Sequence, residues 1–367
     1  MIRGHKIRLY PNNKQETYFK KACGIARFSY NWALSEWKRR SEAGKLVTEA
    51  VLRKELNAVK RVKYPWMLEV TKCAPQLAIK IGLGNAIMNY QAKRAGPPQF
   101  HRKFVNDSFS ISNDQFIIID DKVRVPCLGW VRMAECLRFD GKIIGAAINR
   151  TADEWHISVQ VEMPDAKAEH ASENQAVGVD LGVKNLAILS DGTVVAGSKA
   201  GKKYGQRLRR LNKELSRRKG AKKGEAKSRN FIKTKRKISR LYARAANIRL
   251  DDTHKLTTML AANFGLIGIE NLNIKGMMSN HKLARSIADM SFFEIRRQLE
   301  YKTAASGAKL VIADRWYASS KTCSVCGYVN SSLELKDREW VCINCGEMHE
   351  RDYNASINLK NYAMLNA

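Results

Sequence analysis

The chain has 367 residues, with 65 lysines and arginines against 35 acidic residues and a formal net charge of +30. A hydrophobic content of 44% favours a folded chain over a disordered one, and the length is enough for two or three domains. No stretch reaches the roughly 18 apolar residues of a membrane span. Since each phosphate that a protein neutralises releases condensed counterions, this charge predicts a nucleic-acid partner. A basic membrane-surface protein and a ribosomal protein are the alternatives, and we expect no membrane association.

The N-terminal half changes from a helical to a strand pattern. Residues 1–10 predict a strand, and residues 13–94 have apolar positions at helical spacing up to the breaker at 96–98. The following residues, 100–163, predict a small antiparallel barrel or sandwich with strands separated by Asp and Gly turns. The predicted strands are 115–119, 123–125, 130–133, 143–148 and 155–161.

After residue 176 strands and helices alternate, which predicts an α/β domain. A polar segment, 164–175, predicts a linker before it. The apolar runs that predict strands are 177–181, 186–189, 194–196, 266–269 and 310–313, and helices are expected at 290–305 and 352–364.

A strongly basic block lies between the third and fourth of these strands. Residues 199–249 hold 21 lysines and arginines against Glu214 and Glu225, and apolar residues keep helical spacing on both sides of a break at 220–224. A solvated helical face is the plain interpretation. The charge excess is more than solubility needs, so we expect two basic helices that line a path for phosphates.

Two CxxCG knuckles predict a structural zinc site with four ligands, Cys323, Cys326, Cys342 and Cys345. The glycine after each pair allows a tight turn around the sulfurs. Four thiolates leave no open coordination position, so this zinc is not expected to be catalytic. The remaining cysteines are expected to be free and buried, because a reducing cytoplasm disfavours disulfides. They are Cys23, Cys73, Cys127 and Cys136.

Three acidic residues stand beside apolar strands or at a helix start. Asp180 lies in the segment Val-Gly-Val-Asp-Leu-Gly, Glu270 follows Ile-Gly-Ile, and Asp352 opens the last predicted helix. Singly, they could be a turn acceptor, a salt-bridge partner and an N-cap. Together they predict a site for two Mg²⁺ ions about 4 Å apart, in which the flanking Gly178 and Gly182 let metal and phosphate come close.

The chain resembles the TnpB family, the transposon-encoded RNA-guided nucleases thought ancestral to type V CRISPR effectors. The resemblance covers nearly the whole chain and is carried by several motifs together. These are IRLYPNNKQ (7–15), ARFSYNWAL (26–34), GVDLGVKNLA (178–187), IGIENLNIKGM (267–277), FFEIRRQLEYKTAASG (292–307), SSKTCSVCG (319–327), CINCG (342–346) and HERDYNASINL (349–359).

The resemblance implies a multidomain α+β architecture. A wedge-like β-barrel would comprise 1–11 and 97–172, with a helical recognition lobe, 12–96, inserted into it. An α/β RNase H-like (RuvC) domain, 173–315 and 347–367, would follow, with the zinc ribbon, 316–346, inserted.

The family's metal ligands correspond to Asp180, Glu270 and Asp352, which are all present. One departure is Glu350, where the family usually has Asp, and another is a chain end soon after the last helix. The segment 70–78 resembles the part of the family that reads a short motif beside the target. This places Lys72 and Gln76 near base edges, although ordinary exposed helix residues are the alternative.

These observations predict a Mg²⁺-dependent endodeoxyribonuclease encoded by an insertion sequence. Its partners would be a guide RNA derived from the transposon end and a double-stranded DNA target, in a prokaryotic, nucleoid-associated cytoplasmic setting. One alternative is an RNase H-like transposase or resolvase that acts without RNA, because the same acids serve either chemistry. Another is an RNA-guided repressor that does not cut, which three intact carboxylates disfavour.

Overall fold

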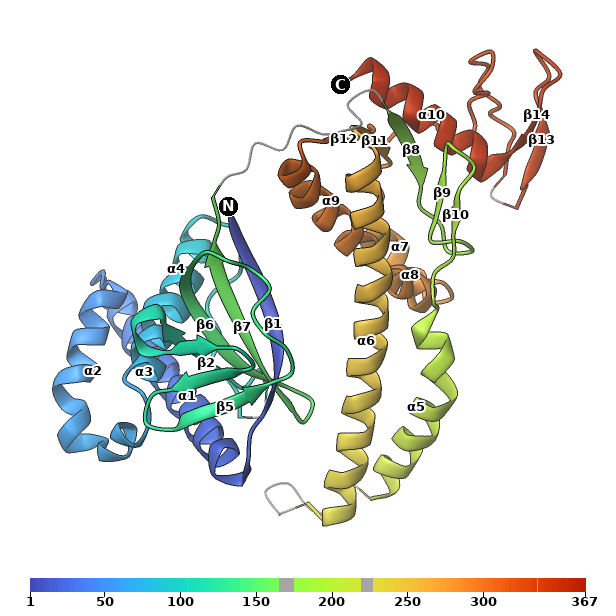
Figure 1. The fold of residues 1–367 in the computed structure, drawn as a ribbon. Coiled ribbons are helices and arrows are strands. Elements are labelled where there is room, and N and C mark those ends of the chain that lie inside the picture. Colours follow the sequence, from blue (N-terminus) through green and yellow to red (C-terminus); the bar gives the residue numbers. More distant parts are fainter. Residues whose placement is uncertain (104, 165–174, 219–226, 335) are drawn as a thin grey trace. The chain divides into compact units, whose positions relative to one another are not determined.

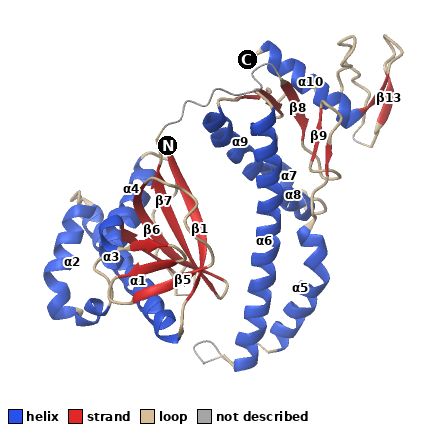
Figure 2. Cartoon of the chain, viewed as in Figure 1, coloured by secondary structure: helices blue, strands red, loops and turns tan. Residues whose placement is uncertain are grey.

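The computed structural model describes residues 1–103, 105–164, 175–218, 227–334 and 336–367. The chain divides into two compact units, Met1–Asp165 and Ala166–Ala367, each with its own core (Figures 1 and 2). The predicted linker lies almost wholly outside the described residues, and so does the break at 220–224. Among the described helices, none is both long and apolar enough to cross a bilayer.

The first unit is built on an antiparallel sheet with the strand order β2-β6-β7-β1-β5-β4-β3. The N-terminal strand β1 therefore pairs with strands that follow it in the chain by more than a hundred residues, β5 and β7. Strand β2 was not predicted. The bounds are β1 (Ile2–Tyr10), β2 (Ser108–Ser112), β3 (Ile117–Ile119), β4 (Lys122–Val125), β5 (Gly129–Met133), β6 (Lys142–Thr151) and β7 (Glu154–Glu162).

The predicted helical region packs on this sheet and shares its core. Helix α1 (Asn13–Glu42) begins with a capping box in which Asn12 and Gln15 exchange hydrogen bonds. Its Phe19 packs against Trp155 of β7, with ring centroids 5.1 Å apart. The other elements are α2 (Glu49–Lys63), η1 (Pro65–Glu69), α3 (Cys73–Leu77), η2 (Ala78–Leu83), α4 (Gly84–Gln91) and η3 (Asn113–Gln115).

The second unit holds a five-stranded mixed sheet in the order β10-β9-β8-β11-β12. The first three strands are antiparallel, whereas β8, β11 and β12 run parallel to one another. All five strands lie where the apolar runs predicted them. Their bounds are β8 (Ala176–Asp180), β9 (Ala187–Leu189), β10 (Val194–Val195), β11 (Leu266–Ile269) and β12 (Lys309–Ile312).

Helices cover both faces of this sheet. On one face, alternate strand residues such as Val177 and Val179 pack with Leu260 of α6 (Arg229–Asn263) and Ile295 of α9 (Phe292–Ser306). The other face carries α10 (Arg351–Leu365), which contacts β8, β9 and β11. The remaining helices are α5 (Ala200–Arg217), α7 (Ile274–Met278) and α8 (Ala284–Met290). A small hairpin, β13 (Glu339–Val341) and β14 (Met348–Glu350), lies between β12 and α10 in the chain.

Two glycines allow α10 to lie directly on the sheet. Gly178 of β8 and Gly268 of β11 are paired in register. A methyl group on Gly178 would lie within 3 Å of the backbone of Ser356 and Lys360, and one on Gly268 would lie within 3 Å of the carbonyl of Leu359. Gly178 was expected to make room for metal and phosphate. Its observed role is to accept the backbone of α10.

We expect Gly178→Ala to destabilise the second unit by about 2–4 kcal/mol, because helix and sheet would have to separate to fit the methyl group. Gly205→Ala is the matched control, since nothing lies within 4 Å of a methyl group there. Because Gly205 lies within α5, Gly205→Ala should raise the free energy of unfolding by about 0.5–1 kcal/mol. Urea denaturation of both variants measures this, and a tolerated Gly178→Ala would contradict the close packing.

Candidate functional site

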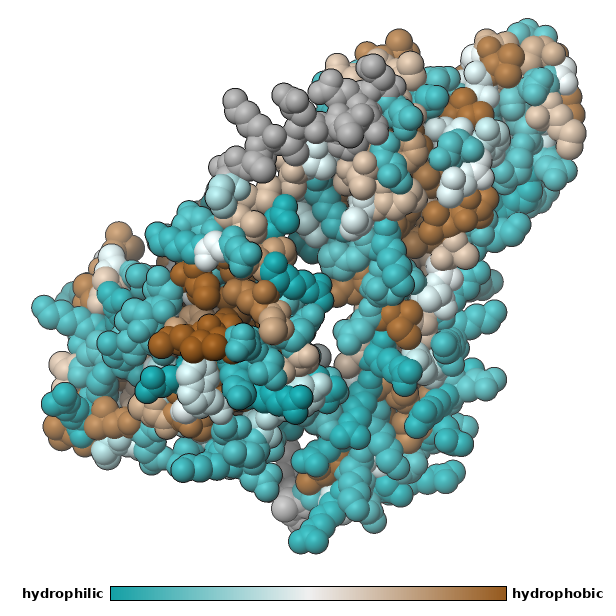
Figure 3. All heavy atoms as spheres, in the orientation of Figure 1, coloured by the Kyte–Doolittle hydropathy of each residue, from teal (hydrophilic) through white to brown (hydrophobic). Residues whose placement is uncertain are grey.

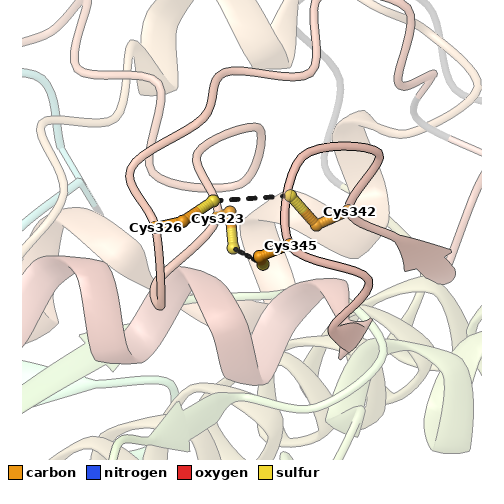
Figure 4. Close-up of side chains that lie close together, drawn as sticks. All are labelled: Cys323, Cys326, Cys342 and Cys345. Atoms are coloured by element: carbon orange, nitrogen blue, oxygen red, sulfur yellow. Dashed lines mark hydrogen bonds between the residues drawn. The ribbon is translucent and has the colours of Figure 1, made fainter.

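Four cysteine side chains converge between β12 and α10 (Figure 4). Their sulfurs, from Cys323, Cys326, Cys342 and Cys345, all lie within 4.8 Å of one another. Cys323 and Cys345 are 3.6 Å apart, as are Cys326 and Cys342, which is too far for a disulfide bond of about 2.05 Å. Thiolates about 2.3 Å from a central zinc would be separated by roughly 3.8 Å. The four residues therefore fit one tetrahedral ion.

The turns of both knuckles have the predicted form. Gly327 and Gly346 have φ angles of +75° and +76°, where a side chain would be strained. Hydrogen bonds from the Asn344 side chain and the backbone N–H of Tyr328 lower the pKa of Cys326 to about 6. This favours the thiolate, which is the form that binds metal.

Buried asparagines fasten helix α10 to the first knuckle. The side chain of Asn354 accepts from the N–H of Ser324 at 2.9 Å and donates to the carbonyl of Thr322 at 2.7 Å. Asn358 donates to the carbonyls of Ser319 and Thr322, at 2.8 and 2.6 Å. Both side chains are nearly inaccessible to solvent. The ribbon is therefore attached to the helix that carries Asp352.

The three predicted carboxylates come together at one edge of the sheet. Asp180 is the last residue of β8, and Glu270 directly follows the neighbouring parallel strand β11. Asp352 lies in the first turn of α10. It is not the helix cap, because Glu350 holds that position and accepts from the N–H of Tyr353 at 3.2 Å. Glu350, the residue that departs from the motif, thus has a local structural role as the cap of α10.

Two of the three carboxylates, Asp180 and Glu270, have a raised pKa. Burial raises the pKa of Asp180 well above its usual range, and the charges of Glu270 and Asp352 raise it further. Burial also raises the pKa of Glu270 to about 7, against the lowering effect of a hydrogen bond from the N–H of Leu181. A bound cation would relieve this repulsion and favour the ionised forms.

Two arginines hold the carboxylate of Asp352. Arg338 places Nη1 3.3 and 3.0 Å from its two oxygens, and Arg351 donates to Oδ1 from Nε and Nη2, at 3.1 and 3.0 Å. Neither contact was predicted. Arg338 directly precedes β13, so the ribbon supplies a cation to the acidic cluster.

The three acids suit divalent metal by their chemistry, but in the described residues their oxygens are not gathered as closely as one shared ion requires. Among the described residues, the cysteines are the one group of three or more histidines, cysteines and acids close enough to hold a single ion. Carboxylate oxygens are the ligands that Mg²⁺ prefers. An arrangement with the acids divided between two neighbouring ions is compatible with this spacing.

Helices α5 and α6 form a hairpin with a basic surface. Leu208 and Leu211 of α5 pack against Ile238 and Leu241 of α6 in a small core of their own. Figure 3 shows hydrophilic side chains over this hairpin. Its exposed basic residues include Lys202, Lys203, Arg207, Arg209, Arg210, Lys213 and Arg217 of α5 and Arg229, Lys233, Lys235, Arg236, Lys237 and Arg244 of α6. The predicted pair of basic helices is confirmed.

A second basic surface lies on the sheet of the first unit. Tyr10 is paired with Arg132, which is paired on its other side with Lys122. In a neighbouring row, Trp130 is paired with Arg124. All five side chains are exposed. Aromatic rings between cations are suited to stacking on unpaired bases.

The other predicted residues have mixed outcomes. Lys72 is exposed and precedes α3, whereas Gln76 lies within α3 and is half-buried, so base contact by these residues stays a prediction. Cys23 and Cys73 are buried as expected. The same prediction is wrong for Cys127 and Cys136, which are exposed, because both lie in connections between strands rather than on the core side of an element.

The chain matches three family models: "Probable transposase" over residues 156–281, "Cas12f1-like, TNB domain" over 292–359 and "Helix-turn-helix domain" over 1–45. It is 30% identical to a "Putative RNA-guided DNA endonuclease" of Streptomyces pristinaespiralis, over 97% of this chain and 88% of that protein. It is also 30% identical to "Putative RNA-guided DNA endonuclease InsQ" of Escherichia coli (strain K12), over 98% and 91%. The chain belongs to the TnpB family.

A solved structure agrees with this assignment in fold. The cryo-EM structure of a Cas12f1-sgRNA-target DNA complex matches with a TM-score of 0.60 and 16% identity, over 95% of this chain and 83% of that one. The multidomain α+β fold class expected from the TnpB motifs is confirmed. The segment matched by the helix-turn-helix model is strand β1 followed by the single long helix α1, and not two helices.

The raised pKa of Glu270 makes the Mg²⁺-free protein pH-sensitive. The pKa of Glu270 is about 7 in the folded protein, whereas that of a glutamate in an unfolded chain is about 4.3. The protonated carboxyl group therefore stabilises the fold at low pH, and this contribution is lost as the pH rises from about 4.3 through about 7. Glu270→Gln should therefore increase the free energy of unfolding at pH 8 by about 1–3 kcal/mol, and have little effect at pH 4. Urea denaturation of the zinc-loaded parent and variant in Mg²⁺-free buffer measures the free energy of unfolding at each of these two pH values. Equal effects at the two pH values would contradict the repulsion.

Proposed function

We propose that this TnpB-family chain is an RNA-guided DNA endonuclease that cuts guide-complementary DNA beside a short flanking motif. The observation that carries the proposal is the meeting of Asp180, Glu270 and Asp352 at one edge of a mixed sheet. The same unit carries the basic α5–α6 hairpin. The names of relatives that match almost end to end support RNA guidance, whereas the name "Probable transposase" belongs to a model matching residues 156–281.

The three carboxylates would hold two Mg²⁺ ions, which when bound supply activation of water and stabilisation of the leaving oxygen. Asp180 ends β8 and Glu270 directly follows β11, and these strands are paired. The distance between the two carboxylates would therefore change little when metal binds. Asp352 is placed by the first turn of α10, and the arginines beside it would compete with a metal for its oxygens. Arg338 is half exposed, and its side chain is free to move toward a DNA phosphate when a metal takes Asp352.

The ribbon cysteines would hold one Zn²⁺ with a structural role, because four thiolates complete its coordination. The guide RNA would derive from the transposon end. The basic hairpin would bind its phosphates, and the aromatic and basic sheet face of the first unit would suit stacking on unpaired bases. Lys72 and Gln76 would read the flanking motif on duplex DNA. The wedge (1–11 and 97–172), recognition lobe (12–96), RuvC (173–315 and 347–367) and ribbon (316–346) boundaries belong to this proposal.

Asp180→Ala should abolish Mg²⁺-dependent cleavage, with a loss of at least about a thousandfold, and leave RNA and DNA binding intact. The unfolding free energy should not fall, because the substitution removes a buried, repelled charge. Asp191→Ala is the control, since Asp191 is an exposed acid in the turn between β9 and β10. A guided cleavage assay with gel-shift titrations measures both properties. Normal cutting by Asp180→Ala would show that the site is elsewhere.

Reversing charge on the hairpin should weaken RNA binding through its electrostatic component. In Arg209→Glu/Lys213→Glu the affinity should fall about tenfold or more near physiological salt, and the slope of log K against log salt should decrease by about 1–2. The control Lys282→Glu/Lys309→Glu makes the same charge change at exposed positions of the same unit outside helices α5 and α6. Equal losses in the two double variants would point to net charge and not to a surface.

Sequencing the RNA that copurifies from the native locus distinguishes guidance from nonspecific binding. One discrete species that ends in sequence from beyond the element boundary supports the proposal. A random mixture removed by moderate salt would favour a transposase or resolvase that acts without RNA.

A further inference from the structure

The imidazole of His349 lies against the cysteine cluster. Its Nε2 is 3.0 Å from the sulfur of Cys323. Both residues are buried, with exposed fractions of 6% for His349 and 1% for Cys323. His349 is the cross-strand partner of Trp340, and the two rings pack with centroids 4.8 Å apart. Strand pairing and ring packing therefore hold one nitrogen of His349 at one sulfur of the cluster.

We propose that His349 is a positioning residue of the ribbon, which donates its Nε2–H to the Cys323 thiolate and links metal loading to the helix that carries Asp352. This inference rests on the proposed metal site of the four cysteines. A hydrogen bond to a coordinating thiolate neutralises part of its charge and fixes its direction, as outer partners of metal ligands commonly do. Because the imidazole is buried, a ring N–H pointing elsewhere without an acceptor would be costly.

His349 and Cys323 are connected to Asp352 through the backbone and through hydrogen bonds of neighbouring residues. His349 is in β14, Glu350 caps α10, and Asp352 lies in the first turn of that helix. On the other side, Ser324, the neighbour of Cys323, donates to Asn354 of α10. The first knuckle is thus attached to α10 both before and after Asp352, so a displaced Cys323 would disturb the first turn of the helix.

The experiment uses the full chain with Co²⁺ in the ribbon, because thiolate-to-cobalt absorption reports the number and environment of the sulfurs. His349→Leu removes the donor, whereas His349→Gln retains an N–H that can reach the sulfur. Leu333→Ala is the matched control, since it removes apolar packing from the same ribbon core but takes away no hydrogen-bond donor and no metal ligand. The readouts are the rate of metal release to a chelator and amide hydrogen exchange in the first turn of α10.

We expect His349→Leu to release metal about tenfold faster, with a shifted absorption band of unchanged intensity and faster exchange in α10. His349→Gln should recover much of the loss, and Leu333→Ala should change release less than His349→Leu. Parent-like release by His349→Leu, or equal effects of all three variants, would overturn the donor role. A loss of band structure that indicates a missing ligand would make His349 a metal ligand instead and also overturn it. Failure of the parent chain to take up any metal would overturn the metal site itself.

Discussion

The contact between helix α10 and the paired glycines of β8 and β11 is the constraint on which the second unit depends. Side chains normally separate the backbone of a packed helix from the strands beneath it. At Gly178 and Gly268 there are none, and the backbone of α10 lies against the strands. Asp352 is therefore brought next to carboxylates that belong to the strand ends. The two glycines therefore help to set the position of Asp352 relative to Asp180 and Glu270.

Helix α10 takes part in both candidate metal centres. Its first turn supplies Asp352, and its buried asparagines bind the backbone around the first cysteine knuckle. The acidic cluster is strained by its own charge, as the raised pKa of Asp180 reflects, whereas the ribbon is held by hydrogen bonds and four converging sulfurs. Helix α10 thus connects the cysteine cluster to the acidic cluster, in which like charges repel one another. Arg338, supplied by the ribbon, moderates the repulsion at Asp352.

Features with a local signature could be predicted from the sequence. The apolar runs predicted all five strands of the second unit, and the two CxxCG knuckles predicted the cysteine cluster. Each of these patterns is complete within a few residues, so no distant contact is needed to recognise it. Strand β2 was missed although Phe109 and Ile111 alternate with serines and are buried. That alternation is a period-of-two signal hidden by small polar residues.

What could not be predicted depends on contacts between distant segments. Nothing near Gly178 in the sequence indicates that Ser356 and Lys360 lie over it, and nothing near Asp352 indicates that Arg338 contacts it. In the segment 349–359, the sequence predicts a functional role for Asp352 alone. In the structure its histidine and asparagines hold the ribbon, a role visible only once Ser319, Thr322 and Cys323 are in place.

The α5–α6 hairpin has a core separate from that of the sheet. The core residues of each helix, Leu208 and Leu211 in α5 and Ile238 and Leu241 in α6, have the spacing found in a coiled coil. Insertion of seven residues in each helix would therefore lengthen the hairpin by about 10 Å and keep the same side of each helix facing the other. The strand ends with their acids would not move. In this architecture the length of the basic hairpin is adjustable independently of the sheet that carries the three acids.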